Sequence, residues 1–344
     1  MEEIRALWVP RWEITDPEAC AGLVETADQC GFNTLFVQVR GRGDAYYNSR
    51  LEPRAEALDG QPPDFDPLTV ILDSAGRAGI EVHAWLNANL TWESETPPKS
   101  PRHIVNSHPE WLMRTVDQGI TWTRESHVEG AYTCPSSEEF REFLRDVFLD
   151  VVRHYQVAGV HFDFIRYPSP RYCYCGRCLS QFAATVGEEE GSVGLTAQDG
   201  DEWDSFRRSL IDDMAYLIYD AVKQTGPRAV VSAAVFSNSA DAYSQRFQDW
   251  KRWLRDGKLD LLCPMAYSES TDTFAEQITD GVESSGNISV CAGIGSWRIP
   301  VESTVEKIAR AREIGAAGVC LFSYSAIGRG CDADYLKAVQ AAAF

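Results

Sequence analysis

Short apolar segments alternate with longer amphipathic segments along the whole chain. Runs rich in β-branched and aromatic residues, bounded by turn residues, predict eight strands, at 5–9, 34–40, 81–87, 159–166, 229–236, 259–267, 288–294 and 318–324. Helix start signals stand between these runs, at Asp16-Pro17, Asp66-Pro67, Ser136-Ser137, Thr273 and Ser303. The pattern is typical of eight consecutive strand–helix units.

Eight such units predict an α/β fold in which a parallel sheet closes into a (β/α)₈ TIM barrel. A doubly wound open sheet is the alternative, but Pro10-Arg11-Trp12 stands where its glycine-rich phosphate-binding turn would follow the first strand. Such a barrel needs about 250 residues. We therefore expect a single barrel domain over 1–344, with loop insertions at 91–137 after the third strand and 169–203 after the fourth. Both lie at the face where barrel enzymes keep their sites.

Polar residues recur at the carboxyl ends of these strands, where purely apolar runs are expected. Gln38 and Arg40 alternate on the second strand, and His161 and Asp163 on the fourth. The third strand carries His83, Trp85 and Asn87. A spacing of two places each set on one face. These residues indicate either a site at the barrel mouth or a hydrogen-bonded polar plug in the lumen.

Asp163 is the first candidate for catalysis because it ends a strand where a carboxylate can face a substrate. Glycoside hydrolysis needs a second carboxylate. Glu269, directly after the sixth strand, is the first candidate partner and Asp44 the next. A solvated loop acid is the alternative for Glu269, and Asp44 can instead orient Arg40 or hold a sugar hydroxyl. The residues expected to bind substrate are Arg40, Asp44, Trp85, Asn87, Arg166, Tyr267, Trp297 and Tyr324.

Composition changes this picture in two ways. The 344 residues contain 32 basic and 51 acidic side chains, a formal charge of −19, which argues against binding to nucleic acid or anionic membranes. Seven of the ten tryptophans nevertheless fall at strand ends or in the long mouth loops, as do five arginines, Arg11, Arg40, Arg42, Arg166 and Arg298. Tryptophan suits stacking on sugar rings. The arginines suit either an anionic sugar or pairing with nearby acids.

No apolar run approaches the roughly 20 residues of a membrane span. The N-terminus lacks the basic and apolar regions of a signal peptide, so the sequence as written is expected to be cytoplasmic. A secreted protein from which the signal peptide has been trimmed is the alternative. The sequence does not indicate an oligomeric state.

Four cysteines form a second candidate site. Cys173, Cys175 and Cys178 lie within six residues after the fourth strand, and Cys134 ends the preceding long loop. Four thiolates favour Zn²⁺ in a closed, structural site. Disulfides and free thiols are the alternatives.

These motifs resemble the bacterial glycosyl-hydrolase-like family 10, a group of TIM-barrel proteins. The resemblance rests on residues 32–40 with Gly43-Asp44-Ala45, on 83–87, on 159–168 and on Phe322-Ser323-Tyr324. It implies glycoside hydrolysis, and some members of the family are linked to peptidoglycan glycan strands. The cysteine loop is similar, locally, to the structural zinc cluster of family-42 β-galactosidases. Those enzymes use glutamates after strands four and seven, whereas this chain has Asp163 and Gly295-Ser296-Trp297, so their catalytic pair does not transfer.

The sequence is therefore interpreted as a glycoside hydrolase that cleaves an oligosaccharide or polysaccharide by a two-carboxylate mechanism, on an anionic or peptidoglycan-type glycan if the arginines bind it. Its expected partner is a carbohydrate, and its expected metal is structural Zn²⁺. A non-catalytic carbohydrate-binding barrel is the alternative, followed by a zinc-dependent hydrolase. A full four-cysteine shell and only six histidines argue against the zinc enzyme.

Overall fold

Eight parallel strands form a closed barrel in the computed structural model, which describes residues 2–126, 128–187, 200–326 and 330–344. They are β1 (Ile4–Val9), β2 (Thr34–Arg40), β3 (Glu81–Asn87), β6 (Gly159–Asp163), β7 (Val230–Phe236), β8 (Leu261–Met265), β9 (Ser289–Ile294) and β10 (Gly318–Phe322). Pairing of β1 with β10, from Ile4 opposite Gly318, closes the barrel. The predicted (β/α)₈ fold and all eight strands are confirmed.

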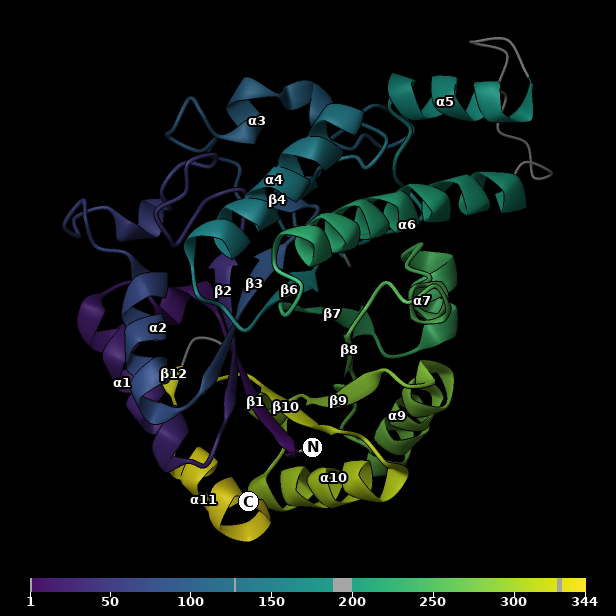
Figure 1. Ribbon diagram of the computed structural model, residues 1–344. Helices are drawn as coiled ribbons and strands as arrows, with labels where there is room; N and C mark the ends of the chain where they lie inside the picture. The colour runs from purple at the N-terminus through teal and green to yellow at the C-terminus, as the bar shows by residue number, and fades with distance from the viewer. Residues whose placement is uncertain (1, 127, 188–199, 327–329) are drawn as a thin grey trace.

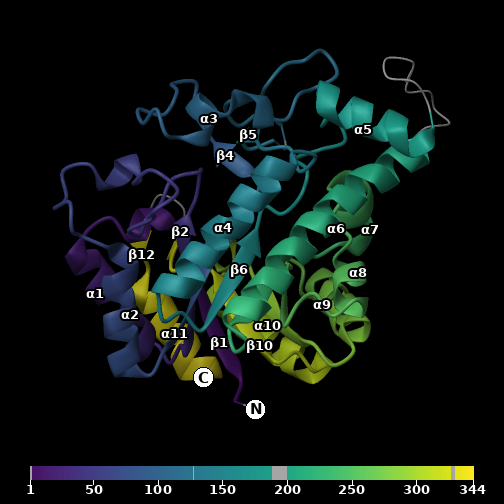
Figure 2. The ribbon, with the colours of Figure 1, turned by 45° about the horizontal axis from the view of Figure 1, so that its top comes forward.

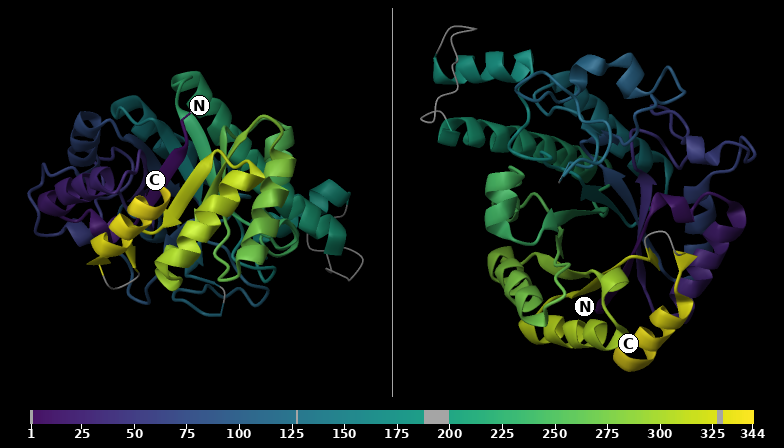
Figure 3. Two further views of the ribbon diagram at one scale, coloured as in Figure 1. Left: turned by 90° about the horizontal axis from the view of Figure 1, so that it is seen from below. Right: turned by 180° about the vertical axis from the view of Figure 1, so that it is seen from behind.

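Helices surround the barrel (Figures 1 and 3). They are α1 (Pro17–Gln29), α2 (Pro67–Ala78), α4 (Glu138–His154), α6 (Gly200–Thr225), α7 (Ser239–Gln245), α8 (Trp250–Arg255), α9 (Thr271–Ser285), α10 (Val301–Ile314) and α11 (Ala333–Ala343). Their apolar faces and the outer faces of the strands form a continuous buried core. None of the helices in the described ranges is long and apolar enough to cross a bilayer.

Side-chain caps begin the first helices where the sequence predicts them. Asp16 accepts a hydrogen bond from the Ala19 amide at 2.8 Å, and Ser137 accepts one from the Phe140 amide at 3.2 Å. The predicted starts at Thr273 and Ser303 are wrong by a few residues. Helix α9 is capped by Ser270, and α10 follows Pro300, which already has the backbone angle that suits a helix entry.

The two long insertions lie over one end of the barrel, opposite the chain termini (Figure 2). The first contains β4 (Leu90–Trp92), α3 (Ile104–Ser107) and β5 (Ala131–Tyr132), with β4 and β5 paired antiparallel. The second contains α5 (Gly176–Val186). The insertions therefore build the walls around the carboxyl ends of the strands.

Candidate active site

A cavity of ≈ 270 Å³ opens at the carboxyl ends of the barrel strands. Its apolar wall consists mainly of aromatic side chains, Trp8, Trp12, Trp85, Phe164, Tyr267 and Phe322. Its polar groups are Arg11, Gln38, Asn87, Glu93, Arg124, Asp163 and Arg166. A largely apolar pocket with a few convergent polar groups is the usual form of a small-molecule site.

Asp163 is the buried acid of this cavity. The strand β6 ends at Asp163 because Phe164 adopts a left-handed backbone conformation, with φ of 52°, which is uncommon for an aromatic residue. The turn brings the Phe164 amide within 2.6 Å of Asp163 Oδ1, to which it donates a hydrogen bond. Burial raises the pKa of Asp163 to about 6, against the opposing effects of Arg166 and this amide. The carboxyl is thus suited to exchange a proton near neutral pH.

Arg166 links Asp163 to a second acid. Its guanidinium lies 3.5 Å from an oxygen of Asp163 and 3.5 Å from one of Glu129. The ring of Phe164 covers the guanidinium at 4.1 Å. Tyr132 donates a hydrogen bond to Glu129. Glu129 contributes to the raised pKa of Asp163 by charge repulsion.

Hydrogen bonds fix the polar side of the cavity. Asn87 Oδ1 accepts from the Trp85 indole at 2.9 Å and from the Gln38 amide at 3.2 Å, and Asn87 Nδ2 donates to the Gly41 carbonyl at 2.8 Å. The Gln38 oxygen accepts in turn from the Arg11 amide. Because each polar atom has a partner, Trp85 and Asn87 present fixed surfaces to a ligand.

Beneath the cavity, a hydrogen-bonded polar plug lies in the barrel lumen, as the alternative interpretation of the strand residues predicts. His161 Nε2 accepts from the Trp8 indole at 3.0 Å, and its Nδ1 lies 2.8 Å from the Ser232 hydroxyl. Burial holds the pKa of His161 well below its usual value, so the ring is neutral. His161 therefore completes the packing of the lumen and does not line the cavity.

The cavity unites five of the predicted site residues: Trp85, Asn87, Asp163, Arg166 and Tyr267. The other five, Arg40, Asp44, Glu269, Trp297 and Tyr324, are not among the described residues that line it. Tyr324 is buried, with its amide donating to the Trp8 carbonyl, and Trp297 packs behind the lining at 5.1 Å from the Tyr267 ring.

Arg40 is fully buried and makes its contacts within the chain. It forms an ion pair with Glu52 at 2.8 Å and donates to the main-chain carbonyl of Asn87. Asp44, also buried, accepts from the Arg42 amide at 3.1 Å. These residues hold the loops after β2 and β3 beneath the cavity.

Glu269 is not among the described residues that line the cavity with Asp163. Its side chain is exposed, and its backbone carbonyl accepts a hydrogen bond from Lys307 at 2.9 Å. The geometry matches the solvated loop acid that was the alternative interpretation of this residue.

Glu93 is a lining carboxylate that the sequence pattern does not reveal. It follows β4 and pairs with Arg11 at 2.9 Å. Gly130, next to β5, passes so close that a Cβ there would lie 2.2 Å from the Trp92 carbonyl oxygen and 3.1 Å from Glu93 Cα. The close approach of these two segments sets the position of Glu93. In the sequence, the only sign of a role for Glu93 is that it follows Trp92 in a loop at the barrel mouth.

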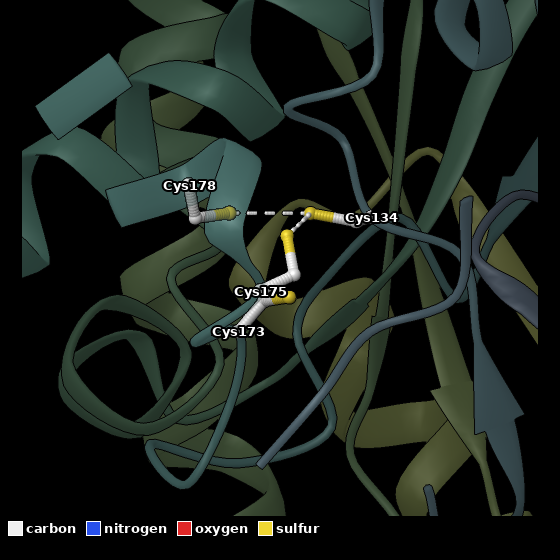
Figure 4. A group of neighbouring side chains, drawn as sticks. All are labelled: Cys134, Cys173, Cys175 and Cys178. Carbon is white, nitrogen blue, oxygen red and sulfur yellow. Dashed lines mark hydrogen bonds between the residues drawn. The ribbon is translucent and has the colours of Figure 1, made fainter. Parts of the chain in front are cut away.

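The four cysteines predicted as metal ligands lie together between the two insertions (Figure 4). All four are buried and form no disulfide, and their sulfur atoms lie within 4.8 Å of one another. Cys134 Sγ lies 3.3 Å from Cys178 and 3.9 Å from Cys175. The Arg114 amide donates to Cys173 Sγ at 3.3 Å.

This arrangement fits a metal ion. Thiolates held at about 2.3 Å from a tetrahedral zinc ion are about 3.8 Å apart, close to the separations observed, whereas a disulfide needs about 2.05 Å. Hydrogen bonds from the other three thiols lower the pKa of Cys175, so the cluster favours a thiolate there. The four cysteines can therefore hold a metal ion that joins α5 to the first insertion.

A parallel eight-stranded barrel with an acid-bearing, aromatic-lined cavity at its mouth has the architecture of a barrel glycosidase. The family model described as Glycosyl hydrolase-like 10 matches residues 3–295. The chain belongs to this family, which confirms the resemblance predicted from its motifs.

Comparison with known proteins agrees with this assignment. The glycosyl hydrolase YngK of Bacillus subtilis (strain 168) is 24% identical over 297 residues, covering 77% of this chain and 54% of YngK. The chain thus spans about half the length of this relative.

Two solved structures share the fold. The glycoside hydrolase domain of PgaB (BpsB) from Bordetella bronchiseptica superposes with a TM-score of 0.74, at 13% identity, over 99% of both chains. A catalytic mutant of the family-42 β-galactosidase Gan42B from G. stearothermophilus has a TM-score of 0.69 at 14% identity, covering 98% of this chain and 56% of its own.

Proposed function

We propose that the chain hydrolyses glycosidic bonds in an oligosaccharide or polysaccharide, with Asp163 as the proton donor to the leaving oxygen. The observation that carries the proposal is a buried carboxyl with a pKa of about 6 in an aromatic-lined cavity at the mouth of the barrel. An acid with this pKa is partly protonated at neutral pH, as general acid catalysis of glycoside cleavage requires. Membership of the family supports the same chemistry.

We propose Glu93 in place of Glu269 as the second carboxylate. Glu93 and Asp163 are the two acids among the described residues that line the cavity. Glu93, paired with Arg11 at 2.9 Å, can attack the anomeric carbon or activate water, whereas Asp163, whose pKa burial raises to about 6, can donate the proton.

The lining arginines support an anionic glycan as substrate, including carboxylate-bearing sugars of the peptidoglycan type. Arg11, Arg124 and Arg166 all reach the cavity. Two of them pair with acids of the chain, and Arg124 makes no hydrogen bond or ion pair with any described residue. Guanidinium groups bind carboxylates well because their geometry matches.

We propose that the four cysteines bind structural Zn²⁺. The sulfur separations, the Arg114 amide on Cys173 and the local similarity to the family-42 cluster support zinc. Four protein ligands leave no position for substrate, so the metal would brace the two insertions and take no part in the hydrolysis.

The test is the release of reducing ends from a panel of β-glucans, xylans, N-acetylglucosamine polymers, uronate polymers and peptide-free peptidoglycan strands. Wild type should cleave at least one of them, and Glu93→Gln should lower kcat by about 10²-fold or more. Glu269→Gln is the matched control and should keep the wild-type rate. If Glu269→Gln lowered kcat and Glu93→Gln did not, Glu269 would be the second carboxylate instead. Binding of a glycan without any cleavage would favour the non-catalytic carbohydrate-binding barrel.

A further inference from the structure

Trp12 is exposed where the cavity opens to solvent. It is 43% exposed, yet it lines the cavity. The other exposed large apolar side chains in the described part of the chain do not line it; they are Val116, Val186 and Tyr243. A solvent-facing indole at a binding site offers a flat apolar face with a polar edge, the surface that a sugar ring stacks on.

The ring of Trp12 is held in a defined orientation. Its indole nitrogen donates to the Ser325 hydroxyl at 3.3 Å, so the loops after β1 and β10 meet at this side chain. The Arg11 guanidinium lies 5.5 Å from the ring centroid and is itself tied to Glu93 and Gln38. A pre-oriented aromatic ring loses little conformational entropy on binding.

The cavity is small, so a long glycan needs an additional binding surface, or platform, outside it. Ordinary ligand pockets occupy about 300–1,000 Å³, and this cavity has ≈ 270 Å³. A glycan chain can therefore place only a short stretch beside Asp163, and the rings next to that stretch must lie over the rim. Trp12 and the exposed Arg124 are both on that rim.

We infer that Trp12 forms a second sugar-binding subsite outside the cavity, and that the chain therefore acts on glycans of several linked rings in preference to single-ring glycosides. The subsite rests on the proposed glycoside hydrolase function, because it places the neighbouring ring while Asp163 faces the bond that breaks. Trp12 contacts the ring by stacking, and Arg124, which also lines the cavity, can reach its polar substituents.

The experiment compares two substrates with Trp12→Ala. The first is the shortest panel oligosaccharide that wild type cleaves, and the second is the glycosyl fluoride of the same sugar, which has a single ring and no aromatic leaving group. Trp12→Ala should lower kcat/KM at least tenfold more on the oligosaccharide than on the fluoride, and Trp12→Phe, which keeps a ring, should recover most of the loss. Tyr243→Ala is the control, because Tyr243 is 45% exposed and stacks on Arg208 away from the cavity.

An equal loss on both substrates would overturn the subsite while leaving the hydrolase function intact. If wild type cleaves no glycan of the panel, the proposed activity fails. Binding of the same oligosaccharides to wild type and Trp12→Ala then decides the subsite. Weaker binding by the variant supports the platform, and equal binding or no binding by either protein overturns it.

Discussion

Burial disfavours the ionised form of Asp163 and so links the stability of the fold to pH. Its pKa is raised to about 6 in the folded chain, so the folded chain binds this proton more tightly than the unfolded chain, where the pKa is about 3.9. Protonation of Asp163 therefore stabilises the folded chain below about pH 4, and this stabilisation is lost as the pH rises through about 6. The total change is at most about 3 kcal/mol for a shift of two pKa units.

Substituting Asp163→Asn should remove this dependence. In urea unfolding at pH 4 to 8, the stability of the variant relative to wild type should rise with pH and level off above about pH 7. Asp212, whose pKa burial also raises to about 6, is present in both proteins and cancels from the difference. If the stability difference between variant and wild type stays constant with pH, the pKa of Asp163 is the same in the folded and unfolded chain, which would contradict the raised value.

Arg40 shows the limit of sequence interpretation for a single residue. Its position at a strand end predicts substrate binding, but nothing in the sequence signals that Glu52, twelve residues later, folds back to pair with it. Arg40→Ala should destabilise the fold by about 3–5 kcal/mol, because it leaves Glu52 buried without its cation.

Thermal and urea unfolding measure this loss. Arg310→Ala, which removes an exposed pair with Glu313, is the matched control and should cost no more than about 1 kcal/mol. Equal effects of the two substitutions would contradict the structural role of Arg40.

At the scale of elements, the barrel strands follow from their composition, because runs rich in β-branched and aromatic residues mark strands that are buried on both sides. Their ends are less predictable. The fourth strand stops at Asp163 instead of 166 because the backbone of Phe164 turns to the left-handed region, which no residue preference at this position indicates. The insertions carry the least pattern, and they supply Glu93 and Arg124 to the cavity.

The cysteine cluster joins these insertions, so metal removal should act on them first. Purified without chelator, the chain should contain about one zinc ion, and Cys178→Ser should lose the metal and lower the Tm. Cys291→Ser, at a buried thiol of the barrel lumen, is the control and should keep the metal. Metal analysis by mass spectrometry decides, and an absence of bound zinc in wild type would contradict the proposed zinc site.

Over the whole molecule, the net negative charge and the arginines of the site lie in different places. The formal charge is −19, yet three arginines line the cavity, so the net charge describes the outer surface better than the site. The barrel architecture could be predicted because the same strand–helix unit repeats eight times. The second carboxylate could not, because its position depends on how two segments of the first insertion, at Glu93 and Gly130, pack against each other above the barrel.

The central claim is that Asp163 donates the proton that breaks a glycosidic bond. The most direct test is the rate of reducing-end release by wild type and Asp163→Asn, from pH 4 to 8, on a glycan that wild type cleaves. The wild-type rate should fall as the pH rises above about 6, the pKa of Asp163, and the variant should be slower by about 10²–10⁴-fold. A variant that cleaves at the wild-type rate with the same pH profile would contradict the claim.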